Sequence, residues 1–332
     1  MLCVEYLLRR DPKWHVRFTA MWYTRMVLSF REPAFWSFFM ILIIILFLCY
    51  NGYGDCMTKY LKNLLKIFLC LYLFMCLSII YFYFFYRLSD NRAFKNQKLL
   101  GHGVYGIDNI DYTNSIEALN LAYDNDIKII EIDFLFTSDN QLVLNHVWNY
   151  NYIKSYYDYM NDKLVDKYTP MSIDYLLNFM QSHKDVYVIV DTKEYDYSDN
   201  MLGIYDALVN KIKNFDSLLA DRFIIQIYNY DHYYNIKNVG FFKNYIFTFY
   251  KMDNPEFYKV TYFCLFHNID VIVIPKEYIL NNVITKKDID LIKSKNIKLY
   301  VHTVNSIEEY NKLLTFGING VYTDFLNYKI IN

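Results

Sequence analysis

Six side chains that could carry out metal, acid–base or phosphate chemistry occur between residues 102 and 193. In chain order they are His102, Glu131, Asp133, His146, Asp191 and Lys193. Three carboxylates can together bind a hard divalent cation such as Mg²⁺ or Ca²⁺, because such cations prefer oxygen ligands. The two histidines are candidates for general acid and base, and Lys193 is a candidate for neutralising a bound phosphate. The set predicts cation-assisted chemistry on a phosphate ester.

Each of these residues also has a purely structural explanation. A single histidine before a glycine is most often a loop residue, and two acids on one strand commonly cap or bridge to lysine. Asp191 with Lys193 is also typical of a structural ion pair. Their joint order and their positions at the ends of apolar runs favour a functional site, because charged groups inside apolar strands are costly when unpaired.

The elements that must position these residues form a repeat. From about Gln97 onward, apolar runs alternate with amphipathic, helix-like stretches; the runs are KLLGHG, IKIIEIDFLF, QLVLNH, VYVIVDTKE, RFIIQIYN, YIFTFY, DVIVIP, IKLYVHTV and NGVYTDF. This alternation indicates a parallel sheet with crossover helices. About eight units fit a (β/α)8 TIM barrel, in which reactive groups lie at the C-terminal ends of the strands. A doubly wound open sheet is the alternative, although no glycine-rich nucleotide loop supports it.

Local signals support the same reading. Ser115, Ser172 and Ser306 stand where three of the helix-like stretches begin, as N-capping residues do. Strand periodicity places Glu131 and Asp133 on one face of their strand, and Asp191 and Lys193 on one face of theirs. We therefore expect the acids to converge at one end of the barrel.

The front of the chain has a different character. Residues 33–54 and 67–86 contain no charged side chain, and each run is long enough to cross a bilayer as a helix. We therefore expect a transmembrane hairpin over residues 33–87, a linker over 88–96 and the barrel over 97–332. A chain beginning near Lys95 is expected to fold without the hairpin. Residues 1–32, rich in basic and aromatic side chains, form either an amphipathic interfacial helix or an ordinary juxtamembrane tail.

Charge is distributed unevenly between these parts. Residues 1–87 contain 10 Lys and Arg against 4 Asp and Glu, whereas the remainder contains 24 against 31. The acidic body argues against a nucleic-acid partner, which requires a clustered basic face. Basic residues are concentrated before the first span and after the second, so we expect the hairpin to place both chain ends, and thus the barrel, in the cytoplasm.

The ordered motifs resemble those of the glycerophosphodiester phosphodiesterase family, which belongs to the same superfamily as the phosphatidylinositol-specific phospholipases C. The resemblance covers about Leu99 to Leu326. The family's motifs are represented, in order, by His102-Gly103, Asn114-Ser115, Glu131-Ile132-Asp133, His146, Asp191-Thr192-Lys193, Thr303 with Asn305, and the final GINGVYTD. Seven partial motifs in the right order are far more specific than any one of them.

The resemblance implies a divergent, bacterial-type member of the family. Together with the apolar runs and the charge bias, it leads us to expect a protein of the bacterial inner or plasma membrane with its catalytic domain in the cytoplasm. It implies hydrolysis of a glycerophosphodiester or related phosphodiester, either a small molecule or a lipid head group. Glu131, Asp133 and Asp191 would bind Mg²⁺ or Ca²⁺, His102 and His146 would exchange the protons, and Lys193 would contact the phosphate.

The sequence also departs from the family pattern. No Arg stands between His102 and Gly103, Val147 replaces an Asp, and Asp191 replaces a Glu. The tyrosine-rich segment from Val147 to Thr169 corresponds to the family's insertion over the site, where its tyrosines either stack on a polyol or pack within the loop. Two other functions therefore stay open: an inactive barrel that serves as a membrane-bound scaffold, and a phospholipase of the lyase type.

Overall fold

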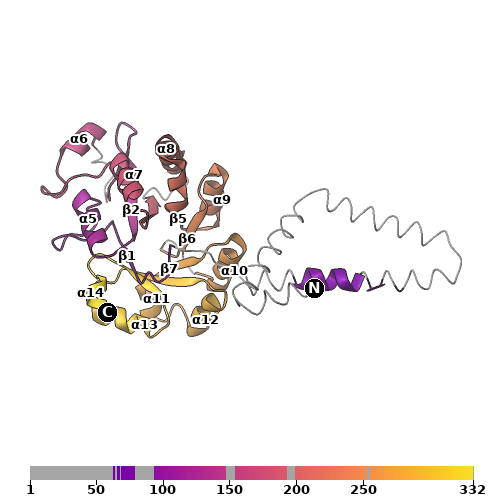
Figure 1. Ribbon diagram of the computed structural model, residues 1–332. Helices are drawn as coiled ribbons and strands as arrows, with labels where there is room; N and C mark the ends of the chain where they lie inside the picture. The colour runs from indigo at the N-terminus through magenta and orange to yellow at the C-terminus, as the bar shows by residue number, and fades with distance from the viewer. Residues whose placement is uncertain are drawn as a thin grey trace, which may run out of the picture. The chain divides into compact units, whose positions relative to one another are not determined.

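The computed structural model describes residues 63, 66–67, 69–78, 93–146, 154–192, 199–250, 252 and 255–331. The chain divides into two compact units, residues 1–82 and 83–332 (Figure 1). The functional candidates all belong to the second unit.

The second unit contains a closed barrel of eight parallel strands, with a further strand attached to its rim. The strands are β1 (Leu99–Gly101), β2 (Ile129–Phe136), β3 (Leu142–Leu144), β4 (Tyr187–Thr192), β5 (Phe223–Ile227), β6 (Asn244–Thr248), β7 (Val271–Pro275), β8 (Lys298–His302) and β9 (Gly320–Thr323). They follow the order β1-β9-β8-β7-β6-β5-β4-β2-β3. Parallel pairing of β1 with both β9 and β2 closes the ring, so the predicted barrel is confirmed and the open sheet is excluded.

The third apolar run is the exception to the expected pattern. We expected QLVLNH to be one of the parallel strands, but β3 pairs with β2 in the antiparallel sense and lies outside the closed ring. The eight-residue β2 is long enough for its last three residues to pair with β3. The chain therefore turns back toward the barrel rather than crossing over to a new barrel strand.

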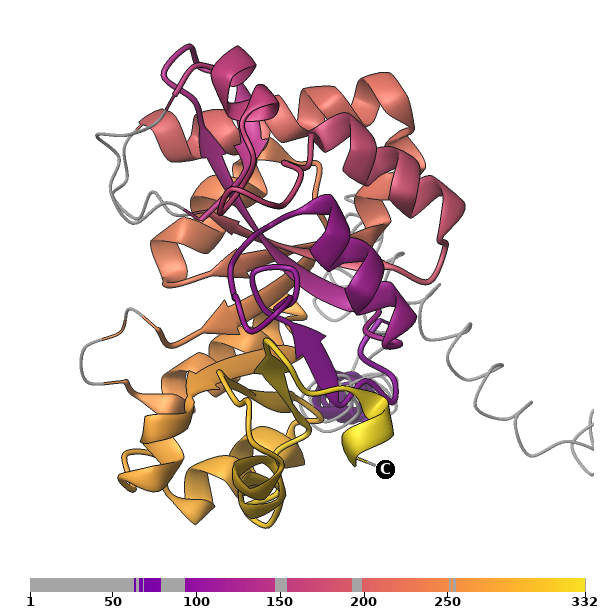
Figure 2. The same ribbon diagram turned by 90° about the vertical axis from the view of Figure 1, so that its left-hand side faces the viewer.

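Helices surround the strands (Figures 1 and 2). They are α5 (Ile116–Asp124), α6 (Tyr156–Asn161), α7 (Ile173–Ser182), α8 (Asp199–Phe215), the 3₁₀ helix η2 (Ser217–Arg222), α9 (Tyr230–Val239), α10 (Phe257–His267), α11 (Lys276–Leu280), α12 (Lys286–Ser294), α13 (Ile307–Leu314) and α14 (Tyr328–Ile331). The predicted caps are confirmed, because the side chains of Ser115, Ser172 and Ser306 each accept a hydrogen bond from a first-turn backbone N–H.

Apolar side chains fill the interior of the barrel below its mouth. This cluster includes Leu100, Ile129, Ile189, Ile224, Ile246, Val271, Tyr300 and Tyr322, one or more from each barrel strand. A separate and larger cluster packs the outer faces of the strands against the helices. The interior is therefore a packed core, as in other barrels of this kind.

The barrel packing begins earlier in the chain than we expected. Ala93 and Phe94 belong to the predicted linker, yet both are buried in the interior cluster, and the Phe94 ring lies 5.6 Å from that of Tyr300. Lys298 donates a hydrogen bond to the Phe94 carbonyl. A chain beginning at Lys95 would therefore lack a side chain that fills the barrel interior.

Only part of the first unit is described. Residues 69–78 are helical, and their large apolar side chains, such as Leu71 and Phe74, are exposed. The predicted first span (33–54) and the segment 1–32 lie outside the described residues, as do residues 68 and 79–86 of the predicted second span (67–86). Among the described residues, no helix combines the length and the apolarity needed to cross a membrane.

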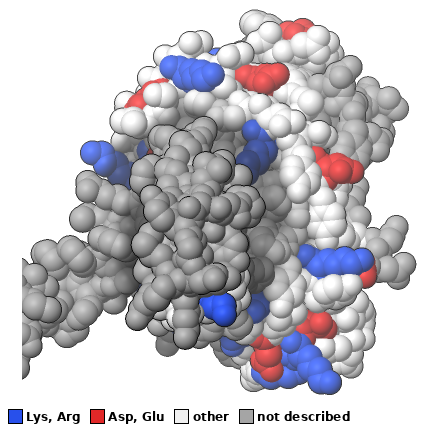
Figure 3. All heavy atoms as spheres, turned by 90° about the vertical axis from the view of Figure 1, so that its right-hand side faces the viewer, with Lys and Arg blue, Asp and Glu red and all other residues white. Residues whose placement is uncertain are grey.

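Charged side chains are mixed on the surface. On the face shown in Figure 3, the described Lys and Arg side chains are interspersed with Asp and Glu rather than gathered by sign. Several exposed pairs are close enough to interact, such as Lys243 with Asp221 at 2.8 Å and Lys211 with Asp174 at 3.2 Å. Exposed pairs of this kind contribute little to stability.

Candidate active site

Three buried carboxylates form an acidic cluster at the C-terminal end of the barrel. Glu131 and Asp133 come from β2, and Asp191 comes from the neighbouring β4, where it is directly paired with Asp133. One carboxylate oxygen from each lies within 4.8 Å of the others, and the residues are 3%, 0% and 4% exposed. Strand pairing therefore brings together the three acids that the sequence predicted would converge.

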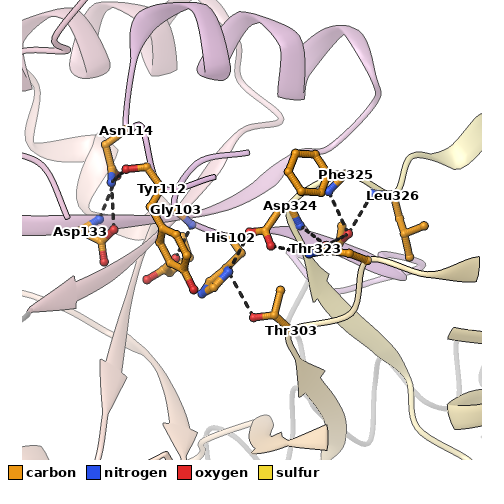
Figure 4. A network of polar contacts seen from close by, with 12 residues as sticks. His102, Gly103, Tyr112, Asn114, Asp133, Thr303, Thr323, Asp324, Phe325 and Leu326 are labelled. Atoms are coloured by element: carbon orange, nitrogen blue, oxygen red, sulfur yellow. Dashed lines mark hydrogen bonds and ion pairs between the residues drawn. The ribbon is translucent and has the colours of Figure 1, made fainter. Parts of the chain in front are cut away.

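Two residues of the β1–α5 connection, Gly103 and Asn114, hold two of these carboxylates in place. The Gly103 backbone N–H donates to Oε2 of Glu131 at 2.7 Å, and the Asn114 amide donates to Oδ2 of Asp133 at 2.9 Å (Figure 4). The Asp133 N–H donates back to Oδ1 of Asn114 at 3.2 Å. Gly103 has a φ of +53°, and a Cβ there would approach Tyr112 to 2.9 Å. Glycine is therefore favoured at this position, directly after His102.

The acidic cluster has the chemistry of a cation site. Its donors are carboxylate oxygens, which Mg²⁺ and Ca²⁺ prefer. Three buried carboxylates so close together repel one another, and a bound divalent cation would remove that cost. The neutral donors of Gly103 and Asn114 orient two of the acids without neutralising them. Glu131, Asp133 and Asp191 therefore fit a divalent cation.

His102 is oriented by Asp324, the residue that directly follows the last strand. Its Nδ1 lies 2.9 Å from Oδ1 of Asp324 and 3.2 Å from the Thr303 hydroxyl (Figure 4). Asp324 is itself held by Asn305, whose amide donates to Oδ2 at 2.6 Å and whose Oδ1 accepts from the Asp324 N–H at 2.8 Å. A carboxylate oxygen only accepts, so an Nδ1–H of His102 would donate to Asp324, and that tautomer leaves the Nε2 lone pair available to take up a proton.

The β2–β3 hairpin brings His146 to the same site. The pairing of Phe134 with Leu144, followed by a hydrogen bond from the Asn145 N–H to the Asp133 carbonyl at 3.0 Å, returns the chain to the level of the acidic cluster. The Tyr112 ring contacts both imidazoles, with its centroid 4.6 Å from that of His102 and 4.4 Å from that of His146. Both histidines and the cluster therefore share one site, and Tyr112 contacts both histidines.

A pocket at this end of the barrel contains most of these groups. Its volume is about 540 Å³, including the part open to solvent. The residues that line it are His102, Tyr112, Glu131, His146, Asp191, Gln226, Thr248, Tyr250, Val273, His302, Thr303 and Tyr322. The pocket spans the whole mouth, because these residues come from every barrel strand or the loops that follow.

Several residues of the site were absent from the predicted set. Asp324 follows the last strand, so the rule that selected the other strand-end residues would also have selected it. Tyr112 and Asn114 lie in a loop, and nothing in the local sequence marks Tyr112. His302 and Tyr322 resemble ordinary strand residues and enter the pocket only because of the barrel geometry.

Other predicted features fall partly or wholly outside the described residues. Lys193, Val147, Tyr150 and Tyr152 are among those not described. Tyr159 packs under β3, where its hydroxyl donates to the Leu144 carbonyl at 2.9 Å. No tyrosine in the described part of the 147–169 segment lines the pocket, so Tyr159 at least is a packing residue.

Comparison with solved structures finds the same barrel in several phosphodiesterases. A glycerophosphodiester phosphodiesterase from Parabacteroides distasonis matches with a TM-score of 0.55 and 17% identity, over 69% of this chain and 93% of that one. The Thermotoga maritima glycerophosphodiester phosphodiesterase matches with a TM-score of 0.51 and 18% identity, over 68% and 93%. An Oleispira antarctica phosphodiesterase, solved with its product sn-glycerol-3-phosphate, matches with a TM-score of 0.55 and 14% identity, over 69% and 93%.

No protein-family model matches the sequence, and no curated protein matches it. The identities to the solved structures are low, so the likeness establishes the fold. The barrel has the fold of the glycerophosphodiester phosphodiesterases, in agreement with the family that the ordered motifs indicated.

Proposed function

We propose that this chain is a cation-dependent phosphoric diester hydrolase of the glycerophosphodiester phosphodiesterase type. The observation that carries the proposal is the convergence of the acidic cluster and two histidines at the mouth of one barrel. The fold of the solved phosphodiesterases supports the same activity. The sn-glycerol-3-phosphate bound to the Oleispira enzyme supports a glycerophosphodiester as the substrate class.

The chain's own residues divide the work between binding and proton transfer. Glu131, Asp133 and Asp191 would hold the divalent cation, which when bound supplies Lewis-acid stabilisation of phosphoryl charge. His102 is the general base, because Asp324 holds its proton on Nδ1 and leaves Nε2 to accept one. It takes the proton from a water molecule or from a neighbouring hydroxyl of the substrate.

His146 is the general acid in this proposal. It donates a proton to the leaving alcohol oxygen as the bond from phosphorus to that oxygen breaks. The Tyr112 ring packs against both imidazole rings. Lys193 is proposed to neutralise phosphate charge from the end of β4, and it lies outside the described residues.

The membrane anchor belongs to the same proposal. Two uncharged runs, residues 33–54 and 67–86, and the basic residues that flank them support an integral membrane protein with a cytoplasmic barrel. Protease added to intact cells is expected to leave the C-terminal domain uncut. Digestion from outside would reverse the proposed topology.

The activity is tested on the full chain by two measurements. Mg²⁺ or Ca²⁺ should raise the melting temperature in a concentration-dependent way, because cation binding favours the folded state. Asp133→Asn should abolish that rise. His146→Ala should keep it and should lower the turnover of a glycerophosphodiester by about 10²–10⁴-fold, since it removes only proton transfer.

The same experiment separates the alternatives. Wild-type protein without cation-dependent stabilisation, together with full activity in His146→Ala, would contradict the proposal. A complete lack of hydrolysis despite cation binding would favour the scaffold. A cyclic phosphate as the final product, in place of a glycerol phosphate, would favour the lyase-type phospholipase.

A further inference from the structure

Tyr322 belongs both to the barrel interior and to the lining of the pocket. It lies on β9, paired with Leu100 of β1, and its side chain belongs to the interior cluster. The same side chain lines the pocket and is 2% exposed. Its ring centroid lies 6.3 Å from that of His102 and 6.3 Å from that of His302. Tyr322 therefore forms part of the floor of the candidate active site.

The Tyr322 hydroxyl is buried and has no hydrogen-bond partner among the described residues. Buried polar groups are normally paired, because a lost hydrogen bond to water must be replaced. Two other buried tyrosines follow this rule: Tyr300 donates to the Gln97 carbonyl at 2.6 Å, and Tyr105 donates to the Leu326 carbonyl at 3.1 Å. The Tyr322 hydroxyl thus has an unused donor at the pocket floor.

Two members of the acidic cluster, Glu131 and Asp191, share the pocket with Tyr322. Burial raises the pKa of Tyr322 well above 10.0, and the negative charges of Glu131 and Asp191 raise it further. The hydroxyl therefore keeps its proton and acts as a neutral donor. Tyr322 lines the same pocket as Glu131 and Asp191, so the donor belongs to the proposed cation site.

We propose that the Tyr322 hydroxyl is a positioning group that donates a hydrogen bond to an oxygen atom bound at the acidic cluster. That oxygen is carried by the bound cation, either as one of its water molecules or as a phosphoryl oxygen of the substrate. The bond satisfies the buried hydroxyl only when the site is loaded. This inference rests on the proposed function, because it takes the acidic cluster as the place where cation and phosphate bind.

Tyr310 provides a matched control elsewhere in the fold. Its hydroxyl is also buried and without a hydrogen-bond partner in the described part of the chain, but it lies on the outer helix α13 and does not line the pocket. Replacing either tyrosine by phenylalanine removes one unsatisfied hydroxyl and keeps the ring. The two variants therefore make the same chemical change, but only Tyr322→Phe makes it at the pocket.

The experiment compares the full-length wild type with Tyr322→Phe and Tyr310→Phe. Without cation, both variants should melt at or above the wild-type temperature, because no partnered hydrogen bond is lost. Titration calorimetry is then done with Mg²⁺ or Ca²⁺ alone, and with sn-glycerol 3-phosphate in the presence of the cation. Tyr322→Phe should weaken either the binding of the cation or the binding of sn-glycerol 3-phosphate by roughly 3- to 10-fold, which is the effect of one hydrogen bond. Tyr310→Phe should leave both affinities unchanged.

Each outcome has a definite meaning. Weaker binding of the cation alone assigns the hydroxyl to a cation-bound water. Unchanged cation binding with weaker binding of sn-glycerol 3-phosphate, and a matching rise in KM rather than a fall in kcat alone, assigns it to a phosphoryl oxygen. Unchanged binding in both titrations, or a lower melting temperature of the cation-free Tyr322→Phe protein, would overturn the inference.

The failure of this inference differs from a failure of the proposed function. If wild-type protein binds neither probe and hydrolyses no diester, the proposed function fails, and Tyr322 has no bound oxygen to contact. If the wild type binds and turns over while Tyr322→Phe equals it, only the role of Tyr322 is wrong.

Discussion

Nδ1 of His102 lies 2.9 Å from Oδ1 of Asp324, although the two residues are 222 positions apart in the chain. His102 follows the first barrel strand and Asp324 follows the last, so the contact exists only because β1 and β9 pair and close the ring. Figure 2 shows these first and last strands side by side. Closure of the barrel thus assembles the pair that we assign to proton abstraction.

Asp324→Asn should lower kcat for a glycerophosphodiester by about 10²-fold or more, because the amide no longer stabilises a protonated His102. The cation-dependent rise in melting temperature should persist, since Asp324 belongs to no part of the acidic cluster. Steady-state kinetics and thermal unfolding measure the two effects. Asp126→Asn, whose carboxylate is 75% exposed, is the control and should keep full activity. Equal kcat values for Asp324→Asn and wild type would refute the assignment of His102 as base.

Asn114→Ala should weaken cation binding without abolishing it. Asn114 is fully buried and exchanges two hydrogen bonds with Asp133, so its loss frees the carboxylate to turn away from its partners. Partners of this kind are typically worth 10- to 100-fold in metal affinity, and we expect a loss of about that size in calorimetric titration. Asn178→Ala, on the exposed face of α7, is the matched control. Unaltered cation affinity in Asn114→Ala would mean that Asp133 needs no such support.

Phe94→Ala should destabilise the barrel by about 3–5 kcal/mol, because it opens a cavity where the ring packs beside Tyr300. The free energy of unfolding of the full chain, measured in urea, tests this. Lys95→Ala, at the exposed neighbouring position, should change it by less than about 0.5 kcal/mol. If the two variants have similar free energies of unfolding, Phe94 is not part of the barrel core and the barrel begins at residue 97, as the sequence predicted.

Acid should destabilise the protein partly through His232. Burial lowers the pKa of His232 to about 4 from 6.5, and its Nδ1 accepts the Tyr228 N–H at 3.3 Å. Between pH 6.5 and 4 the unfolded chain takes up a proton that the folded chain does not. The free energy of unfolding should therefore fall over this range, by roughly 3 kcal/mol at most, and be unaffected by this group above it.

His232→Gln should remove this contribution. Unfolding in urea at pH 7.5 and at pH 5 gives the comparison, and the variant should lose less stability between the two than the wild type does. An identical loss in both proteins would assign the acid sensitivity to other groups.

The features that could be predicted from the sequence are those that depend on residues close together in the chain. Alternating Ile and Val strands and the serine caps depend on neighbours within a few positions, so the repeat and its helix starts could be predicted. Glu131 and Asp133 share a strand face for the same reason. Once a parallel barrel is assumed, consecutive strand ends must meet at one rim, which placed Asp191 beside them.

The tertiary structure alone decided which distant residues complete the site. The antiparallel return of β3, and not a crossover strand, carries His146 to the rim, because β2 is long enough for its last residues to pair with it. Pairing of β1 with β9 brings Asp324 to His102. The packing of the barrel interior includes the Phe94 ring and places Tyr322 at the pocket floor. These contacts depend on how the whole sheet closes and fills its interior, and residue types that are read locally do not specify that closure.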